Sequence, residues 1–302
     1  VSMVEINNEN SLIHQYLSGS IDKLPDIYIL ELQKLWNKWL KEKYKSVESL
    51  RQAWSYSVFA NNVDIEKGSV PIVKIRDTVP SETLRDFYQF LLDIEQKYWQ
   101  EMYDYLKNDL KIKSIICGTQ LGYSSPFIQA KLDYIDNHAY WCHPSPIDSN
   151  WEISNESMVN SMSCIRSLSS QRIYGKPYTI SEYNHPFPNQ YGAEGQIMLR
   201  AYGRLQGWDG VFGYTYNHRK DEEPDKNTYF FSMAGRTDIL AHLPACAAIY
   251  LRGDANEANS ELIGYIDSSA YFNRLISNKK ISVGVEAIGY NSLQSLVHKI
   301  AL

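Results

Sequence analysis

The sequence predicts an α/β fold built around a parallel sheet. Short apolar segments that end in polar or aromatic residues alternate along the chain with longer segments of helical periodicity. The 302 residues are 44% hydrophobic and 22% charged, as is usual for a globular protein with a sizeable core. This length allows one large domain or two smaller ones.

Each element follows from its residue pattern. The expected strands cover residues 1–6, 112–117, 132–138, 178–182 and 211–216. The expected helices cover residues 26–44, 46–54, 80–107, 157–168, 193–206 and 238–251, and Gly207 is a natural residue to stop the fifth of these. Residues 55–79 lack periodicity and are expected to form a long loop. Beyond residue 254, we expect short strands at 261–266 and 281–285 and a helix at 291–299.

Helix 80–107 has the clearest pattern. Ser81 is placed to cap its start, and an apolar stripe is expected to face the core. The members of that stripe are Leu84, Phe87, Leu91, Ile94, Tyr98 and Met102.

Composition argues against several classes of protein. The net charge of −5 does not fit a nucleic-acid-binding surface, and the dense charge run at residues 219–225 is interpreted as solvated surface. No segment approaches the length of a membrane-spanning helix, so no membrane partner is expected. The four cysteines lack C-x-x-C spacing, which argues against zinc, and Cys117 and Cys246 are expected to be buried free thiols.

Two segments carry candidate catalytic carboxylates. Residues 4–10 read VEINNEN and residues 178–186 read YTISEYNHP. Each resembles a strand whose carboxyl end presents one glutamate, Glu9 in the first and Glu182 in the second. A pair of carboxylates is the minimum needed to cleave a glycosidic bond, since one protonates the leaving oxygen while the other attacks the anomeric carbon or activates water.

These segments resemble the retaining glycoside hydrolases of clan A, which include families 5 and 42. In that clan an Asn-Glu pair ends strand four, as Asn8-Glu9 does here, and a glutamate ends strand seven, as Glu182 does here. The stretch from Trp36 to Trp54 also resembles a segment that follows strand four in several of these enzymes. The resemblance covers residues 1–254 and implies a (β/α)8 barrel represented only by strands four to eight. Residues 255–302 would then form an extension, either a small β module or a cap on the barrel.

The resemblance assigns roles to individual residues. Glu9 would be the general acid/base, Glu182 the nucleophile, and Asn8 a partner of the substrate 2-hydroxyl. Tyr140, or His138 in its place, would bond Glu182, although His138 also fits a core histidine. Further candidates for substrate contact are Trp141, His185, Tyr214, Tyr216 and His218. Each of these also fits packing or solvent exposure.

The implied function is retaining hydrolysis of β-linked glycans, with an oligo- or polysaccharide as substrate. The two carboxyl groups would have to lie roughly 5 Å apart. No cofactor or metal is expected, because four histidines (His138, His143, His185, His218) lack ligand spacing. The alternatives are a non-catalytic carbohydrate-binding fragment and a structural half-barrel that associates with itself through open sheet edges. No signal peptide is visible, and a secreted or periplasmic location is favoured over a cytoplasmic one.

Overall fold

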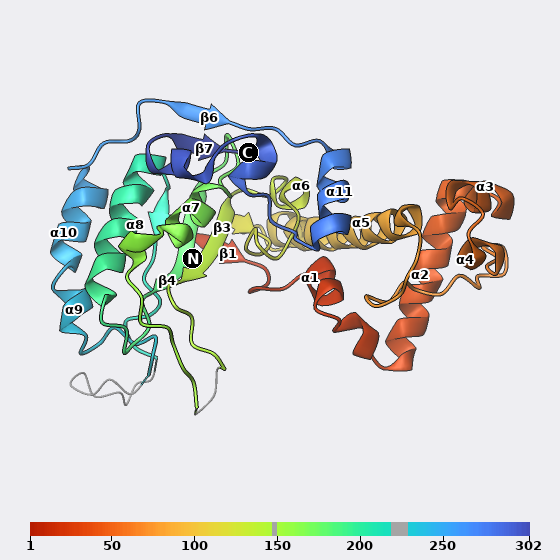
Figure 1. The fold of residues 1–302 in the computed structure, drawn as a ribbon, viewed down its shortest axis with the longest axis horizontal. Coiled ribbons are helices and arrows are strands. Elements are labelled where there is room, and N and C mark those ends of the chain that lie inside the picture. Colours follow the sequence, from red (N-terminus) through yellow and green to blue (C-terminus); the bar gives the residue numbers. More distant parts are fainter. Residues whose placement is uncertain (147–149, 219–228) are drawn as a thin grey trace. The chain divides into compact units, whose positions relative to one another are not determined.

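The computed structural model describes residues 1–146, 150–218 and 229–302 (Figure 1). Its strands and helices alternate, and every paired strand in the described chain is parallel to its neighbour, as expected for an α/β fold. The charge run at residues 219–225 lies outside the described residues. Within those residues, no helix is long and apolar enough to cross a membrane.

Packing divides the chain into two compact units. The first contains residues 1–128 and 267–282, and the second contains residues 129–266 and 283–302. The short helix α6 (Pro126–Gln129) contains residues of both. This division does not test the predicted extension from residue 255, which stays a prediction.

The first unit contains two strands and a set of helices of very different length. In chain order these elements are β1 (Met3–Glu5), α1 (Leu12–Leu17), a 3-10 turn (Ile21–Lys23), α2 (Asp26–Tyr44), α3 (Val47–Ala53), α4 (Val58–Asn61), α5 (Ser81–Asp104), a π-helical turn (Tyr105–Asp109), β2 (Ile115–Cys117) and α11 (Ser268–Asn278). The expected helices at 26–44 and 46–54 are confirmed, and Ser46 caps the second by accepting from the Ser49 backbone. The expected loop at 55–79 contains one short helix, α4.

The strands of the first unit are shorter than expected but run as predicted. β1 pairs in parallel with β2, with Glu5 opposite Cys117. Backbone bonds continue past the strand ends, from Ile6 N to Cys117 O and from Asn7 N to Gly118 O. The carboxyl ends of both strands therefore lie at one edge, where parallel sheets carry their functional loops.

The buried face of α5 differs from the predicted stripe. Phe87, Phe90 and Trp99 are buried, whereas Tyr98 is 37% exposed. Phe87 contacts Tyr16 of α1 edge-on at 5.2 Å, and Phe90 contacts Trp36 of α2 at 5.0 Å. Because helices pack against α5 from more than one side, its buried face is wider than one apolar stripe. Ser81 is the first helical residue and does not cap the helix through its side chain.

The second unit contains the other strands. Its elements are β3 (Ile135–Tyr140), a 3-10 turn (Met158–Asn160), α7 (Ser163–Ser169), β4 (Tyr178–Asn184), α8 (Gly192–Gln206), β5 (Gly210–Val211), α9 (Thr237–Leu240), α10 (Leu243–Ala247), a π-helical turn (Ala248–Arg252), β6 (Glu261–Ile263), two 3-10 turns (Val285–Ile288 and Ser292–Leu296) and β7 (Lys299–Ala301). Helix α8 ends at Gly207, whose φ of 68° is left-handed as predicted.

A three-stranded parallel sheet in the order β3-β4-β5 forms the centre of this unit. Asn137 of β3 pairs with Ile180 of β4, but the next residue, His138, pairs with Glu182. Ser181 is therefore an extra residue in β4, which makes a β-bulge. The strand predicted to end at His138 continues to Tyr140, and the strand predicted at 211–216 covers only Gly210–Val211.

Several predictions beyond residue 210 are corrected by the structure. The expected helix at 238–251 is divided into α9, α10 and a π-helical turn, with Pro244 in the first turn of α10. Proline lacks a backbone donor, so a continuous helix is interrupted there. Strand β6 lies within the expected segment 261–266 and pairs with β7. No strand forms at 281–285, and the helix expected at 291–299 is a 3-10 turn.

Packing of α8 against β4 leaves no room for a side chain at Gly195. A Cβ placed there would lie 2.0 Å from His185 Nδ1 and 2.9 Å from the Tyr183 hydroxyl, and both residues are fully buried. We expect Gly195→Ala to lower the free energy of unfolding by roughly 1–3 kcal/mol, because overpacking outweighs the better helix propensity of alanine. Urea unfolding measures this. Gly122→Ala is the control, since a Cβ there meets nothing within 4 Å; equal stability of the two variants would contradict the prediction.

Candidate active site

The first candidate carboxylate, Glu9, follows β1 and is held through its backbone. Its amide donates to Gln120 Oε1 at 2.8 Å, and the next amide, that of Asn10, donates to Thr119 Oγ1 at 3.3 Å. Gln120 is fully buried, and its Nε2 donates to the carboxylate of Glu5. Gln120 therefore links the end of β1 to the loop that carries Glu9.

The backbone of Glu9 has an uncommon conformation. Its φ is 46°, in the left-handed region that residues other than glycine adopt at an energetic cost. The bond from Glu9 N to the buried Gln120 side chain supports this conformation. Asn8 is exposed, whereas Glu5, the last residue of β1, is half-buried.

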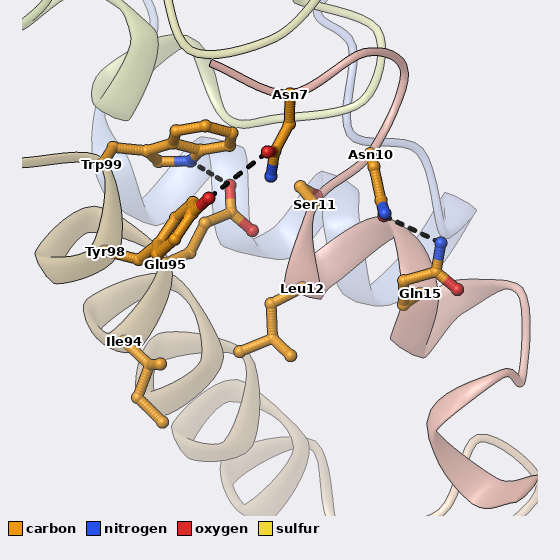
Figure 2. A pocket seen from close by; sticks show the side chains of 9 residues that line it. All are labelled: Asn7, Asn10, Ser11, Leu12, Gln15, Ile94, Glu95, Tyr98 and Trp99. Atoms are coloured by element: carbon orange, nitrogen blue, oxygen red, sulfur yellow. Dashed lines mark hydrogen bonds between the residues drawn. The ribbon is translucent and has the colours of Figure 1, made fainter. Parts of the chain in front are cut away.

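A cavity of about 350 Å³ lies beside this loop in the first unit (Figure 2). The residues that line it are Asn7, Asn10, Ser11, Leu12, Gln15, Ile94, Glu95, Tyr98 and Trp99. The Tyr98 hydroxyl donates to Asn7 Oδ1 at 3.3 Å, so the Asn7 side chain is turned towards α5. Burial raises the pKa of Glu95, although its carboxylate accepts from Ile13 N and Ser124 Oγ.

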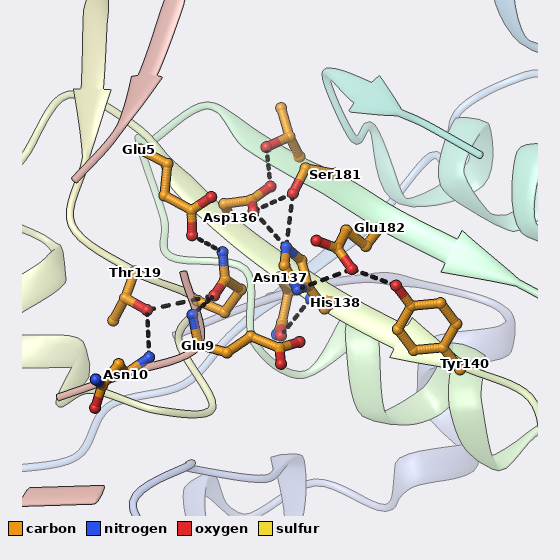
Figure 3. Close-up of polar contacts among 12 residues, drawn as sticks. Glu5, Glu9, Asn10, Thr119, Asp136, Asn137, His138, Tyr140, Ser181 and Glu182 are labelled. Atoms are coloured by element: carbon orange, nitrogen blue, oxygen red, sulfur yellow. Dashed lines mark hydrogen bonds and ion pairs between the residues drawn. The ribbon is translucent and has the colours of Figure 1, made fainter. Parts of the chain in front are cut away.

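The second candidate carboxylate, Glu182, lies on β4 in the second unit. The Tyr140 hydroxyl donates to Glu182 Oε2, and His138 Nδ1 lies 3.7 Å from the same oxygen (Figure 3). The hydrogen bond predicted between Tyr140 and Glu182 is therefore present. The Glu182 side chain is 20% exposed and that of His138 is 4% exposed, so a largely buried histidine borders a carboxylate that solvent still reaches.

Aromatic side chains pack around the ring of Tyr140. Its ring stacks on Phe231 with centroids 4.3 Å apart and meets Tyr214 edge-on at 6.1 Å. His218 is exposed and contacts the ring of Tyr214 at 5.6 Å. Tyr216 is 62% exposed. Rings of this kind can pack against the C–H faces of a sugar.

Two of the predicted contact residues lie below the surface. His185 is fully buried, and the ring of Trp141, which is 8% exposed, stacks on it with centroids 6.2 Å apart. The Tyr183 hydroxyl lies 2.9 Å from His185 Nδ1, and Arg236 donates to the His185 backbone carbonyl. The His185 ring is therefore inaccessible to a ligand and is not part of the proposed site.

The structure adds residues that the sequence did not single out. Gln120 beside Glu9, and Asp136 and Ser181 beside His138, all have polar partners within their own unit. Period-2 alternation along the strand of residues 132–138 places Asp136 on the same face as His138, which was a usable signal. Ser181 gave no such signal, because its position depends on the bulge.

The sequence matches a family of known proteins. The sequence model of glycoside hydrolase family 42, described as beta-galactosidase, matches residues 3–222. The parallel α/β architecture with polar residues at the strand ends is of the TIM-barrel type, as in glycoside hydrolases of this kind. The chain belongs to glycoside hydrolase family 42.

Solved structures of this family are similar in fold at low sequence identity. A catalytic mutant of Gan42B, a family 42 beta-galactosidase from G. stearothermophilus, matches with a TM-score of 0.52 and 14% identity over 87% of this chain and 40% of its own. A second structure of Gan42B gives a TM-score of 0.53 and 15% identity over the same shares. The chain thus spans about 40% of the length of these structures. No curated protein matches it.

The buried imidazole of His185 makes stability depend on pH. Desolvation and the nearby Arg236 lower its pKa from 6.5 to about 3. The unfolded chain therefore binds a proton below pH 6.5 that the folded chain does not, so stability is lost as pH falls from 6.5 towards 3. We expect His185→Phe to remove on the order of 2 kcal/mol of the loss between pH 6.5 and about 4.5. Urea unfolding across this range measures it, with exposed His143→Gln as the control; parallel pH curves for wild type and His185→Phe would refute the assignment.

Proposed function

We propose that this chain carries the two catalytic carboxylates of a retaining β-glycosidase, with Glu182 as nucleophile and Glu9 as general acid/base. Membership of family 42 supports the glycosidase class. The observation that carries the assignment is the environment of Glu182, whose carboxylate accepts from Tyr140 and faces His138 at the carboxyl end of a parallel strand. Such an environment stabilises an anion that solvent still reaches.

In this mechanism Glu182 attacks the anomeric carbon while Glu9 protonates the departing oxygen, which breaks the glycosidic bond and leaves a glycosyl ester on Glu182. Water then attacks the ester, Glu9 accepts the proton from that water, and the sugar leaves with its configuration retained. Glu182 must enter the reaction ionised and Glu9 protonated. Donation by Tyr140 favours the first requirement.

The proposed role of Glu9 is supported by the hydrogen bond that holds its backbone amide. Gln120 holds the Glu9 amide and also binds Glu5, so this glutamine fixes the loop against the end of β1. The general acid must reach the glycosidic oxygen within hydrogen-bond distance, and a fixed backbone limits the positions that its short side chain can take. A retaining mechanism requires its two carboxyl groups to lie roughly 5 Å apart.

The substrate that we propose is a β-galactoside, because the matching family is described as beta-galactosidase and two similar structures are beta-galactosidases. We further propose that β1, β2, β3, β4 and β5 correspond to strands four to eight of the barrel. Their order along the chain and their parallel pairing support this correspondence. Asn8 is then the proposed partner of the substrate 2-hydroxyl.

Glu182→Gln should abolish turnover of an aryl β-galactoside, because the amide cannot form the glycosyl ester. The rate should fall by more than roughly 1,000-fold, as for removal of a unique nucleophile. A 2-fluoro-β-galactoside with a good leaving group should label wild type, and peptide mass spectrometry should locate the adduct on Glu182. Glu152→Gln, an exposed glutamate of the same unit, is the control. An adduct on another carboxylate, or undiminished activity of Glu182→Gln, would end the nucleophile assignment.

Glu9→Ala should affect substrates according to their leaving groups. Loss of a general acid costs roughly 100- to 10,000-fold, but a dinitrophenolate departs without protonation, so its glycosylation step should be nearly unchanged. Added azide should restore turnover of this variant and yield the β-galactosyl azide, since Glu182 still forms the ester. Exposed Glu82→Ala serves as the control. Equal losses for good and poor leaving groups, without azide rescue, would exclude Glu9 as the acid/base.

A further inference from the structure

The second unit contains a buried carboxylate close to His138, the neighbour of Glu182. Asp136 of β3 is 2% exposed, and it accepts from Thr179 Oγ1 and Ser181 Oγ of β4, each at 2.5 Å (Figure 3). Two hydroxyl donors stabilise the ionised form of a carboxylate. This carboxylate lies inside the strand pair, two residues before His138 and on the same face of β3.

These contacts fix the location of one proton on His138. Ser181 Oγ lies 2.9 Å from His138 Nε2, and its single proton is committed to Asp136. Ser181 must therefore accept from the ring, so Nε2 carries hydrogen. Asp136 Oδ2 lies 3.5 Å from the same nitrogen, which favours that proton further.

The opposite nitrogen of the ring faces the candidate nucleophile. His138 Nδ1 lies 3.7 Å from Glu182 Oε2. A neutral ring with its proton on Nε2 would present a lone pair to this carboxylate, whereas an imidazolium presents a second N–H. Among the described residues of the second unit, Asp136 from β3 and Glu182 from β4 have oxygens 3.5 Å and 3.7 Å from the ring nitrogens, and Tyr140 from β3 donates to Glu182. Two carboxylates on opposite sides of one ring favour the cation.

We propose that Asp136 is a positioning residue: through Ser181 it holds His138 as an imidazolium whose Nδ1–H faces Glu182. The proposal rests on the assignment of Glu182 as nucleophile. It extends the polar network from His138, which lies beside Glu182, to Ser181 and Asp136. Asp136 itself does not contact the reacting atoms. Its effect is to keep a donor aimed at the anion before substrate arrives, so no reorientation is needed during the reaction.

The β-bulge makes this network possible. In a regular strand Ser181 and Glu182 would point to opposite faces of the sheet. The extra residue in β4 sets Glu182 opposite His138 while Ser181 still reaches both Asp136 and the ring. Bulges are frequent beside active sites, where they redirect side chains.

Asp136→Asn tests the proposal in the intact chain. Side-chain nitrogen NMR of the histidine rings, with His138→Gln used to assign the signal, should show both His138 nitrogens protonated near neutral pH in wild type. Asp136→Asn and Ser181→Ala should each convert the ring to a neutral form. Labelling of Glu182 by the 2-fluoro-β-galactoside should slow about 10-fold, less than the roughly 100-fold cost of removing a directly donating group.

Thr179→Val is the matched control, because it removes one donor to Asp136 without touching His138. It should leave the His138 signal cationic, and Ser181→Ala decides the question if Asp136→Asn fails to fold. A neutral His138 in wild type, an unchanged signal in Ser181→Ala, or equal loss of the cation in Thr179→Val would each overturn the proposal. Labelling of a carboxylate other than Glu182 would instead overturn the proposed function, and the protonation of His138 would still be readable.

Discussion

The register of β3 against β4 is the constraint on which the second half of the candidate site depends. These two strands pair in parallel, and the extra residue at Ser181 shifts the register just before Glu182. A shift of one residue exchanges the two faces of a strand, so the same sequence without the bulge would turn Glu182 away from His138 and Tyr140. Hydrogen bonds from Thr179 and Ser181 to Asp136 join the two strands on one side of the bulge. The bulge places Ser181 within reach of Asp136, and the hydrogen bonds to Asp136 in turn stabilise the strand pairing beside the bulge.

The other half of the candidate site, around Glu9, depends on a side-chain contact to the backbone. Glu9 lies beyond the end of β1, and its left-handed backbone is held by the side chain of Gln120, from the loop after β2. The same glutamine binds Glu5, so the end of β1 and the loop beyond it share one support. Both halves thus rely on hydrogen bonds between residues that are far apart in the chain. Such non-local contacts require the parallel strands to be paired.

Much of this organisation was predictable from residue patterns. The strand that precedes Glu9 and the strand that contains Glu182 are present as expected. So are the helices at 26–44 and 193–206 and the Tyr140–Glu182 hydrogen bond. These features depend on local periodicity, on a helix-stopping glycine and on a family motif.

The remaining features depend on tertiary packing. The bulge at Ser181 has no local sequence signature, and the burial of His185 depends on Gly195 of α8 lying against its ring. Helix α5 turned a wider face inward than its apolar stripe indicated, because large aromatic residues of both α1 and α2 pack against it. The residue pattern of one segment does not predict which side chains of other segments pack against it.

Helix α11 gives the first unit an unusual dependence on late synthesis. It belongs to that unit, yet residues 129–266 separate it from the rest. Tyr271 of this helix meets Phe127 edge-on at 5.3 Å and is itself almost completely buried. A ribosome must therefore synthesise residues 129–266 after α5 before α11 can cover it.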